Sequence, residues 1–135
     1  MNINKSNRPI IKIELRLFDK ILEAIALLLL TCTIILVAYY YKTLPEIIPT
    51  HFNFSGKVDD YGSKSSILTL PILSALLYIG LTVLNKYPQT FNYLSEITLD
   101  NAESQYRFAT RFLRVLKIIV MITFLIIIFS IVSNI

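Results

Sequence analysis

Three apolar stretches divide this sequence, and each is long enough to cross a lipid bilayer as a helix. They lie at residues 21–41, 65–84 and 115–135, and a helix of about 20 apolar residues spans the hydrocarbon core. Only 16% of the residues are charged, whereas soluble domains have roughly 25%. The sequence therefore predicts an all-α membrane protein, with three transmembrane helices and a single domain over residues 1–135.

The basic residues predict how the chain is oriented. Five precede the first apolar stretch, three lie in the 44–64 loop or next to it, and five lie from residue 86 to residue 117, between the second stretch and the start of the third. Because Lys and Arg favour the cytoplasmic side, we expect the N-terminus and residues 85–114 to be cytoplasmic, and the 44–64 loop and the C-terminus to be external.

The first stretch exceeds the apolar region of a signal peptide and no A-x-A-like site follows it, so it predicts an uncleaved anchor. The net charge of +4 comes from basic residues that flank apolar stretches. This favours lipid headgroups over nucleic acid as the partner.

The segment before the first stretch permits two structures. Ile11, Leu15, Phe18 and Leu22 share one face of a helix, and strict alternation from residue 11 to 17 also permits a strand. The uninterrupted run into the first stretch favours a helix that lies at the membrane surface and bends inward. A further helix should begin near Thr98 or Asp100, with Glu103 in capping-box spacing, and continue unbroken into the third stretch.

Charged residues at the cytoplasmic rim predict ion pairs between the first and third helices. Asp19 and Glu23 are one turn apart on the first helix. A stripe of arginines lies at helical spacing before the third stretch: Arg107, Arg111 and Arg114. Contact with lipid headgroups is one interpretation of the stripe. A lone carboxylate inside an apolar run is costly, so we expect Glu23 to face the bundle and meet Arg111 or Arg114.

The 44–64 loop is the polar segment between the first two apolar stretches, and it contains the only His of the chain. Alternation around His51 and Asn53, a turn at Gly56 and a return from residue 58 to 61 predict a short hairpin-like loop. Gly56 is expected to take a positive φ. The candidate binding residues are those that combine polar, aromatic or turn-forming character in this loop: Pro45, Pro49, His51, Asn53, Gly56, Asp59, Tyr61, Gly62 and Lys64.

Two kinds of chemistry are compatible with this loop. The first is a structural or binding role, with side chains that hydrogen-bond the backbone and hold the loop in shape. The alternative is a metal-dependent or acid–base membrane enzyme centred on His51, Asn53 and Asp59, since His titrates near neutral pH. The residues do not form a known catalytic motif, and one His with a buried Cys32 cannot complete a zinc site. We therefore expect a protein that is not an enzyme and needs no cofactor and no metal.

The loop resembles a known family. The pattern L-P-x-x-I-P-x-H-x-N-x-x-G-x-x-D-x-Y-G-S-K, from Leu44 to Lys64, is similar to the domain-of-unknown-function family 1648 (DUF 1648) of bacterial membrane proteins. The stretches at residues 85–93 and 101–106 also resemble short forms of this family. The same loop occurs at the start of the larger SdpI-type immunity proteins, which protect Bacillus against a secreted toxin and signal to a repressor.

The resemblance implies a multi-pass protein of the bacterial inner membrane with an exposed motif loop. This chain has only about three spans, whereas the SdpI-type proteins have more. The expected function is non-enzymatic binding, sensing or immunity by the external loop. Its expected partners are membrane lipid and, at the loop, a peptide, a toxin or a membrane protein.

Overall fold

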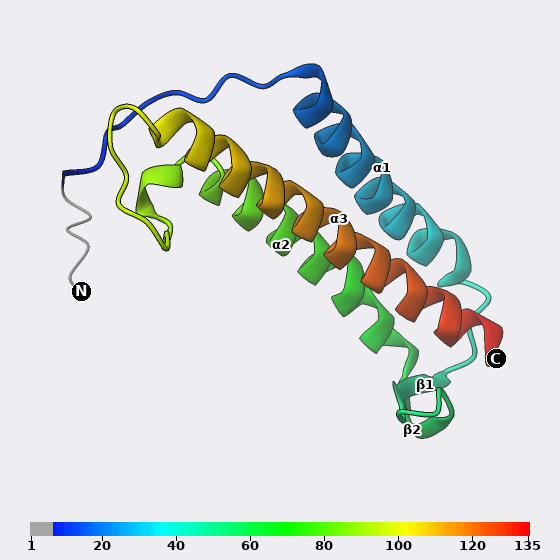
Figure 1. Cartoon of the computed structure of the whole chain (residues 1–135). Helices are drawn as coiled ribbons and strands as arrows, with labels where there is room; N and C mark the ends of the chain where they lie inside the picture. The colour runs from blue at the N-terminus through cyan, green and yellow to red at the C-terminus, as the bar shows by residue number, and fades with distance from the viewer. Residues whose placement is uncertain (1–6) are drawn as a thin grey trace.

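The computed structural model describes residues 7–135, and it consists mostly of three long helices that run side by side (Figure 1). Helix α1 is Leu17–Tyr40, α2 is Thr69–Leu84 and α3 is Ala102–Ser133. The short 3-10 segment η2 (Lys64–Leu68) leads into α2, and together they form one apolar helical stretch. All three stretches are long and apolar enough to cross a membrane, which agrees with a multi-pass membrane protein.

Helix α3 packs against both of the other helices and extends beyond them at one end (Figure 1). Its 32 residues span about 48 Å at 1.5 Å per residue, more than the hydrocarbon core of a bilayer. The N-cap of the helix is Asn101, and not the predicted cap Thr98 or Asp100. Asn101 Oδ1 accepts a hydrogen bond from the Thr98 amide, and Glu103 pairs with Arg107 instead of closing a capping box.

Two strands form the hairpin between α1 and α2, as the alternation and turn chemistry predict. Strand β1 (Ile47–Phe52) pairs antiparallel with β2 (Val58–Ser63), and the register shifts on both sides of His51. The hairpin lies at one end of the bundle, together with the C-terminus (Figure 1). The N-terminal segment and the 85–101 connection, which contains the 3-10 turn η3 (Pro88–Thr90), lie at the other end.

The segment before α1 is extended, so the predicted surface helix from Ile11 to Leu22 is wrong for its first half. Two carbonyl groups of residues 8–16, here called the N-terminal strap, accept hydrogen bonds from side chains of α3. Tyr106 Oη donates to the Pro9 carbonyl at 3.0 Å, and Arg107 Nη1 donates to the Glu14 carbonyl at 3.0 Å. Ile11 and Ile13 pack on the cluster that contains Tyr106. Contacts with α3 therefore override the helical periodicity, and α1 begins only at Leu17.

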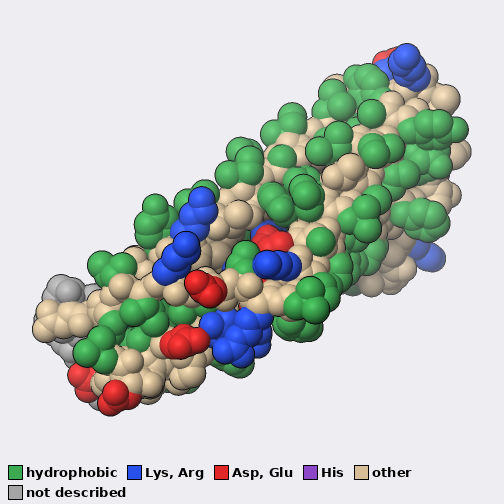
Figure 2. Space-filling model, turned by 90° about the horizontal axis from the view of Figure 1, so that it is seen from above, with side chains coloured by type: hydrophobic (Ala, Val, Ile, Leu, Met, Phe, Trp, Pro, Cys, Tyr) green, Lys and Arg blue, Asp and Glu red, His purple; other side chains and the backbone are tan. Residues whose placement is uncertain are grey.

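Apolar side chains cover much of the molecular surface, while charged side chains gather toward one half of the elongated body (Figure 2). A bundle surrounded by water would bury these apolar residues, and their exposure suits contact with lipid. The buried core is divided between the two ends. One cluster joins the hairpin to the ends of α1 and α3, and the other joins the strap to the start of α3.

Candidate functional site

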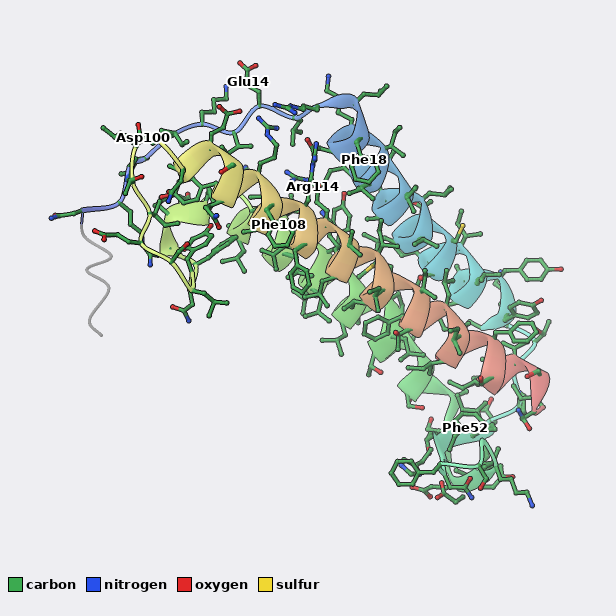
Figure 3. The ribbon with its side chains drawn as sticks, in the orientation of Figure 1. Glu14, Phe18, Phe52, Asp100, Phe108 and Arg114 are labelled. Atoms are coloured by element: carbon green, nitrogen blue, oxygen red, sulfur yellow. The ribbon has the colours of Figure 1, made fainter. Side chains whose placement is uncertain are left out.

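The hairpin is fixed to the end of the bundle by its inward-facing side chains. Ile48 is fully buried in a cluster with Val37 of α1 and Ile128 of α3. Leu44 joins this cluster just before the hairpin, and Phe52 packs on its edge (Figure 3). Burying a side chain of this size contributes about 1.5–3 kcal/mol. The hairpin therefore rests on the helix ends and does not stand free.

The turn of the hairpin is built by Asn53 and Gly56. Asn53 Oδ1 accepts hydrogen bonds from the amides of Ser55 at 2.9 Å and Lys57 at 3.0 Å. Gly56 has a φ of 73°, as the sequence predicts, and this is a region that costs other residues about 1–2 kcal/mol. Both residues shape the backbone, which explains their place in the motif without a ligand.

Two pairs of polar side chains cross the hairpin. His51 Nδ1 pairs with the Asp59 carboxylate, and Lys64 Nζ lies 2.6 Å from Glu46 Oε1. The His51 pair is exposed to solvent, and the backbone is bulged at this position. Exposed pairs add little to stability, about 0–1 kcal/mol. Their effect here is to hold particular side-chain orientations on the hairpin surface.

The remaining motif residues divide into packed and exposed positions. Pro49 is buried beneath the hairpin. A Cβ at Gly62 would lie 2.9 Å from Thr50 Cγ2, so this position favours glycine. Tyr61 is exposed, and Pro45 is exposed before β1. Phe54, which lies in the turn, is fully exposed although the motif does not single it out.

The structure separates the residues of the alternative enzymatic interpretation. His51 and Asp59 are together, but Asn53 Oδ1 is engaged by the turn backbone. Within residues 7–135, the side chains of His, Cys, Asp and Glu do not gather in groups of three or more that could hold a metal ion.

The opposite end of the bundle contains the ion pairs of the rim. Arg111 Nε lies 2.7 Å from Asp19 Oδ1, and Arg107 Nη1 lies 3.8 Å from Asp19 Oδ2. Arg114 extends from α3 toward α1, and its Nε lies 3.0 Å from Glu23 Oε1 (Figure 3). Glu23 thus meets one of the two arginines expected for it. The side chain of Asp19 is almost fully buried, so it faces the bundle and not the lipid headgroups.

Lys117 completes this network, and sequence reasoning missed it. It is fully buried, and its Nζ lies 2.5 Å from Glu23 Oε2 and 2.9 Å from Thr82 Oγ1 of α2. The same ammonium group lies 4.5 Å above the ring of Tyr78. A signal was available, because Lys117 follows Arg114 by three residues and extends its helical face. The network joins all three helices.

The tyrosine beneath the strap, Tyr93, is half-buried. Tyr93 Oη donates to the Pro88 carbonyl at 2.9 Å, and Arg8 lies 5.3 Å above its ring. The pKa of Tyr93 is raised to about 12, chiefly by burial and also by the neighbouring Tyr106, while Arg8 opposes the shift. Arg8 Nη1 also donates to the carbonyls of Gln89 and Phe91, which ties the strap to the 85–101 connection.

Comparison with known proteins identifies the region that carries the hairpin. Residues 28–75 match a family described as "Domain of unknown function (DUF1648)". This confirms the predicted resemblance for the end of α1, the hairpin and the start of α2. The matched segment ends at residue 75, so the resemblance of the later stretches stays a prediction.

One curated relative matches over a similar length. An uncharacterized protein of Archaeoglobus fulgidus is 37% identical over 60 residues, which cover 38% of this chain and 33% of the relative. The chain thus spans about a third of the length of that relative. No solved structure matches the chain.

Proposed function

We propose that this protein presents its hairpin outside the cell membrane as a rigid, non-enzymatic recognition surface for an extended segment of a peptide, toxin or partner protein. The supporting observation is the combination of a hairpin anchored through buried Ile48 with exposed Ile47, Phe54 and Tyr61. Aromatic side chains on a preorganised surface are frequent anchors of protein recognition.

The backbone supports a polypeptide partner. The sheet has two strands, so each strand has one edge that is not paired within the sheet. Extended peptides bind to such edges by backbone hydrogen bonds, while side-chain contacts provide specificity. The exposed Tyr61 and the His51–Asp59 pair lie on these strands and would contact a bound segment.

The orientation belongs to the same proposal. The excess of basic residues near the N-terminus and in the 85–114 region supports a cytoplasmic position for that end, with the hairpin and the C-terminus facing outward. The resemblance to SdpI-type proteins adds an immunity or signalling role to this proposal, with a secreted toxin as the bound polypeptide.

Site-specific crosslinking in living cells tests the proposal. A photoreactive phenylalanine analogue at position 54 should capture a polypeptide, whereas the same analogue at Leu94, which is equally exposed at the other end, should not. Tyr61→Ala should reduce the yield from position 54. Absence of a specific adduct at position 54 in cells exposed to secreted peptides would contradict the proposal.

A second candidate rests on the His51–Asp59 pair alone. Such a pair can exchange a proton with a bound molecule, and a metal ion could join it. Metal analysis of the purified protein beside a His51→Ala variant separates the two candidates. Stoichiometric metal that the variant loses would favour the enzymatic alternative.

A further inference from the structure

The end of the bundle that carries the ion pairs also contains a cavity of about 540 Å³. It lies between the N-terminal strap, the end of α2 and the side of α3, and its size is typical of ligand sites. The polar and charged residues that line it come from these elements and from α1: Lys12, Glu23, Thr82, Asn85, Lys86, Thr110 and Arg114. The cavity is distinct from the hairpin, which lies at the opposite end.

Asn85 provides the most specific observation in this cavity. Both polar atoms of its side-chain amide, Nδ2 and Oδ1, are buried and make no hydrogen bond to any described residue. A buried polar group without a partner costs about 1–3 kcal/mol. An amide donates through Nδ2 and accepts through Oδ1, so a ligand that carries both an acceptor and a hydroxyl group would satisfy both atoms.

The charge of the lining selects an anion. Lys12, Lys86 and Arg114 carry three positive charges, and Glu23 is the one carboxylate. Arg114 and Glu23 pair with each other, whereas Lys12 and Lys86 form no ion pair with residues 7–135. Two cations at the mouth of a partly buried cavity favour a phosphate group.

Most of the remaining lining is apolar and comes from the strap. Ile11, Ile13 and Leu15 contribute side chains to the same cavity. A free phosphate ion gains nothing from such walls, whereas the glycerol backbone and first acyl carbons of a lipid do. Basic cavities between membrane helices are known to take lipid headgroups.

We propose that this cavity binds the headgroup of an anionic, hydroxyl-bearing phospholipid of the phosphatidylglycerol type. The phosphate lies between Lys12 and Lys86, and a headgroup hydroxyl and a phosphate oxygen satisfy Oδ1 and Nδ2 of Asn85. The bound lipid thereby ties the strap to the end of α2.

Native mass spectrometry of the full-length protein in detergent tests this site. Under the same conditions, phosphatidylglycerol should remain bound to the protein and phosphatidylcholine should dissociate. Inorganic phosphate should not displace phosphatidylglycerol. Lys12→Gln and Lys86→Gln should each weaken phosphatidylglycerol binding about fivefold. Lys20→Gln, an exposed position on α1 outside the cavity, should leave binding unchanged.

Asn85→Leu separates binding from folding. This substitution keeps the charge, fills part of the cavity and removes the unpaired amide, so thermal stability without lipid should be equal or higher. Binding of phosphatidylglycerol should be lost. Equal retention of both lipids, displacement by inorganic phosphate, or the same loss in Lys20→Gln would overturn the proposal. Undiminished binding by Asn85→Leu would also overturn it.

Discussion

Lys117 Nζ lies 2.5 Å from Glu23 Oε2, and this contact joins α3 to α1 inside the bundle. Arg114 binds the other carboxylate oxygen of Glu23, and Thr82 of α2 binds the same ammonium group as Glu23. Each charge therefore has partners, which is the condition for keeping ions in an apolar environment. The network fixes how the three helices meet at the end opposite the hairpin.

Removing the carboxylate should destabilise the bundle. Glu23→Gln leaves buried Lys117 and Arg114 without their counterion, a change that costs about 3–5 kcal/mol. Glu14→Gln is the matched control, because the Glu14 side chain is exposed and, within residues 7–135, it is the Glu14 backbone carbonyl that accepts a hydrogen bond. The fraction of protein that stays monodisperse in detergent after heating measures the difference.

A double substitution tests the pairing itself. Glu23→Lys should destabilise the protein strongly, and Arg114→Glu in the same chain should restore part of the loss by exchanging the two charges. The single variant Arg114→Glu is the control for folding. If this variant folds normally and the double variant regains no stability, the pair does not hold the helices together.

The turn of the hairpin depends on the backbone of Gly56. Gly56→Val forces a β-branched residue to a φ of 73°, which should disorder the hairpin at a cost of about 1–2 kcal/mol and leave the three helices intact. Limited proteolysis should cut the variant within residues 53–58. Gly80→Ala is the control: a Cβ there meets nothing within 4 Å, so this helix should be unchanged or slightly more stable.

Tyr93 should ionise only at high pH. The folded protein raises its pKa to about 12, whereas a tyrosine in an unfolded chain titrates near 10. The neutral phenol is therefore favoured by folding, so its contribution is fully present below pH 10 and is lost as the pH rises through 12. The tyrosinate absorbance of the wild type minus that of Tyr93→Phe should rise near pH 12. A difference centred near pH 10 would mean that the ring is solvated.

The parts of the fold that local patterns determine could be predicted from sequence. Long apolar runs specify membrane helices regardless of their neighbours. Asn53 and Gly56 specify a turn by their own chemistry. Glu23 could be assigned an arginine partner because an unpaired carboxylate in an apolar run is costly.

The parts of the fold that depend on distant residues could not be predicted from the sequence. The strap is extended because Tyr106 and Arg107, almost a hundred residues away, bind its carbonyls. Lys117 follows the arginines of α3 in sequence, and only the packing of three helices reveals that it is fully buried. The exposure of Phe54 likewise depends on how the hairpin rests on the helix ends, which the sequence does not specify.

The most direct test of the proposed recognition surface is the side of the membrane on which the hairpin lies. With Cys32 replaced by Ala, a single cysteine is placed at Ser55 in the turn or, as the control, at Ser95 at the other end. Both positions are exposed. A membrane-impermeant maleimide applied to intact cells should label position 55 and leave position 95 unlabelled until the cells are lysed. Labelling of position 95 in intact cells, with position 55 reacting only after lysis, would contradict an external hairpin.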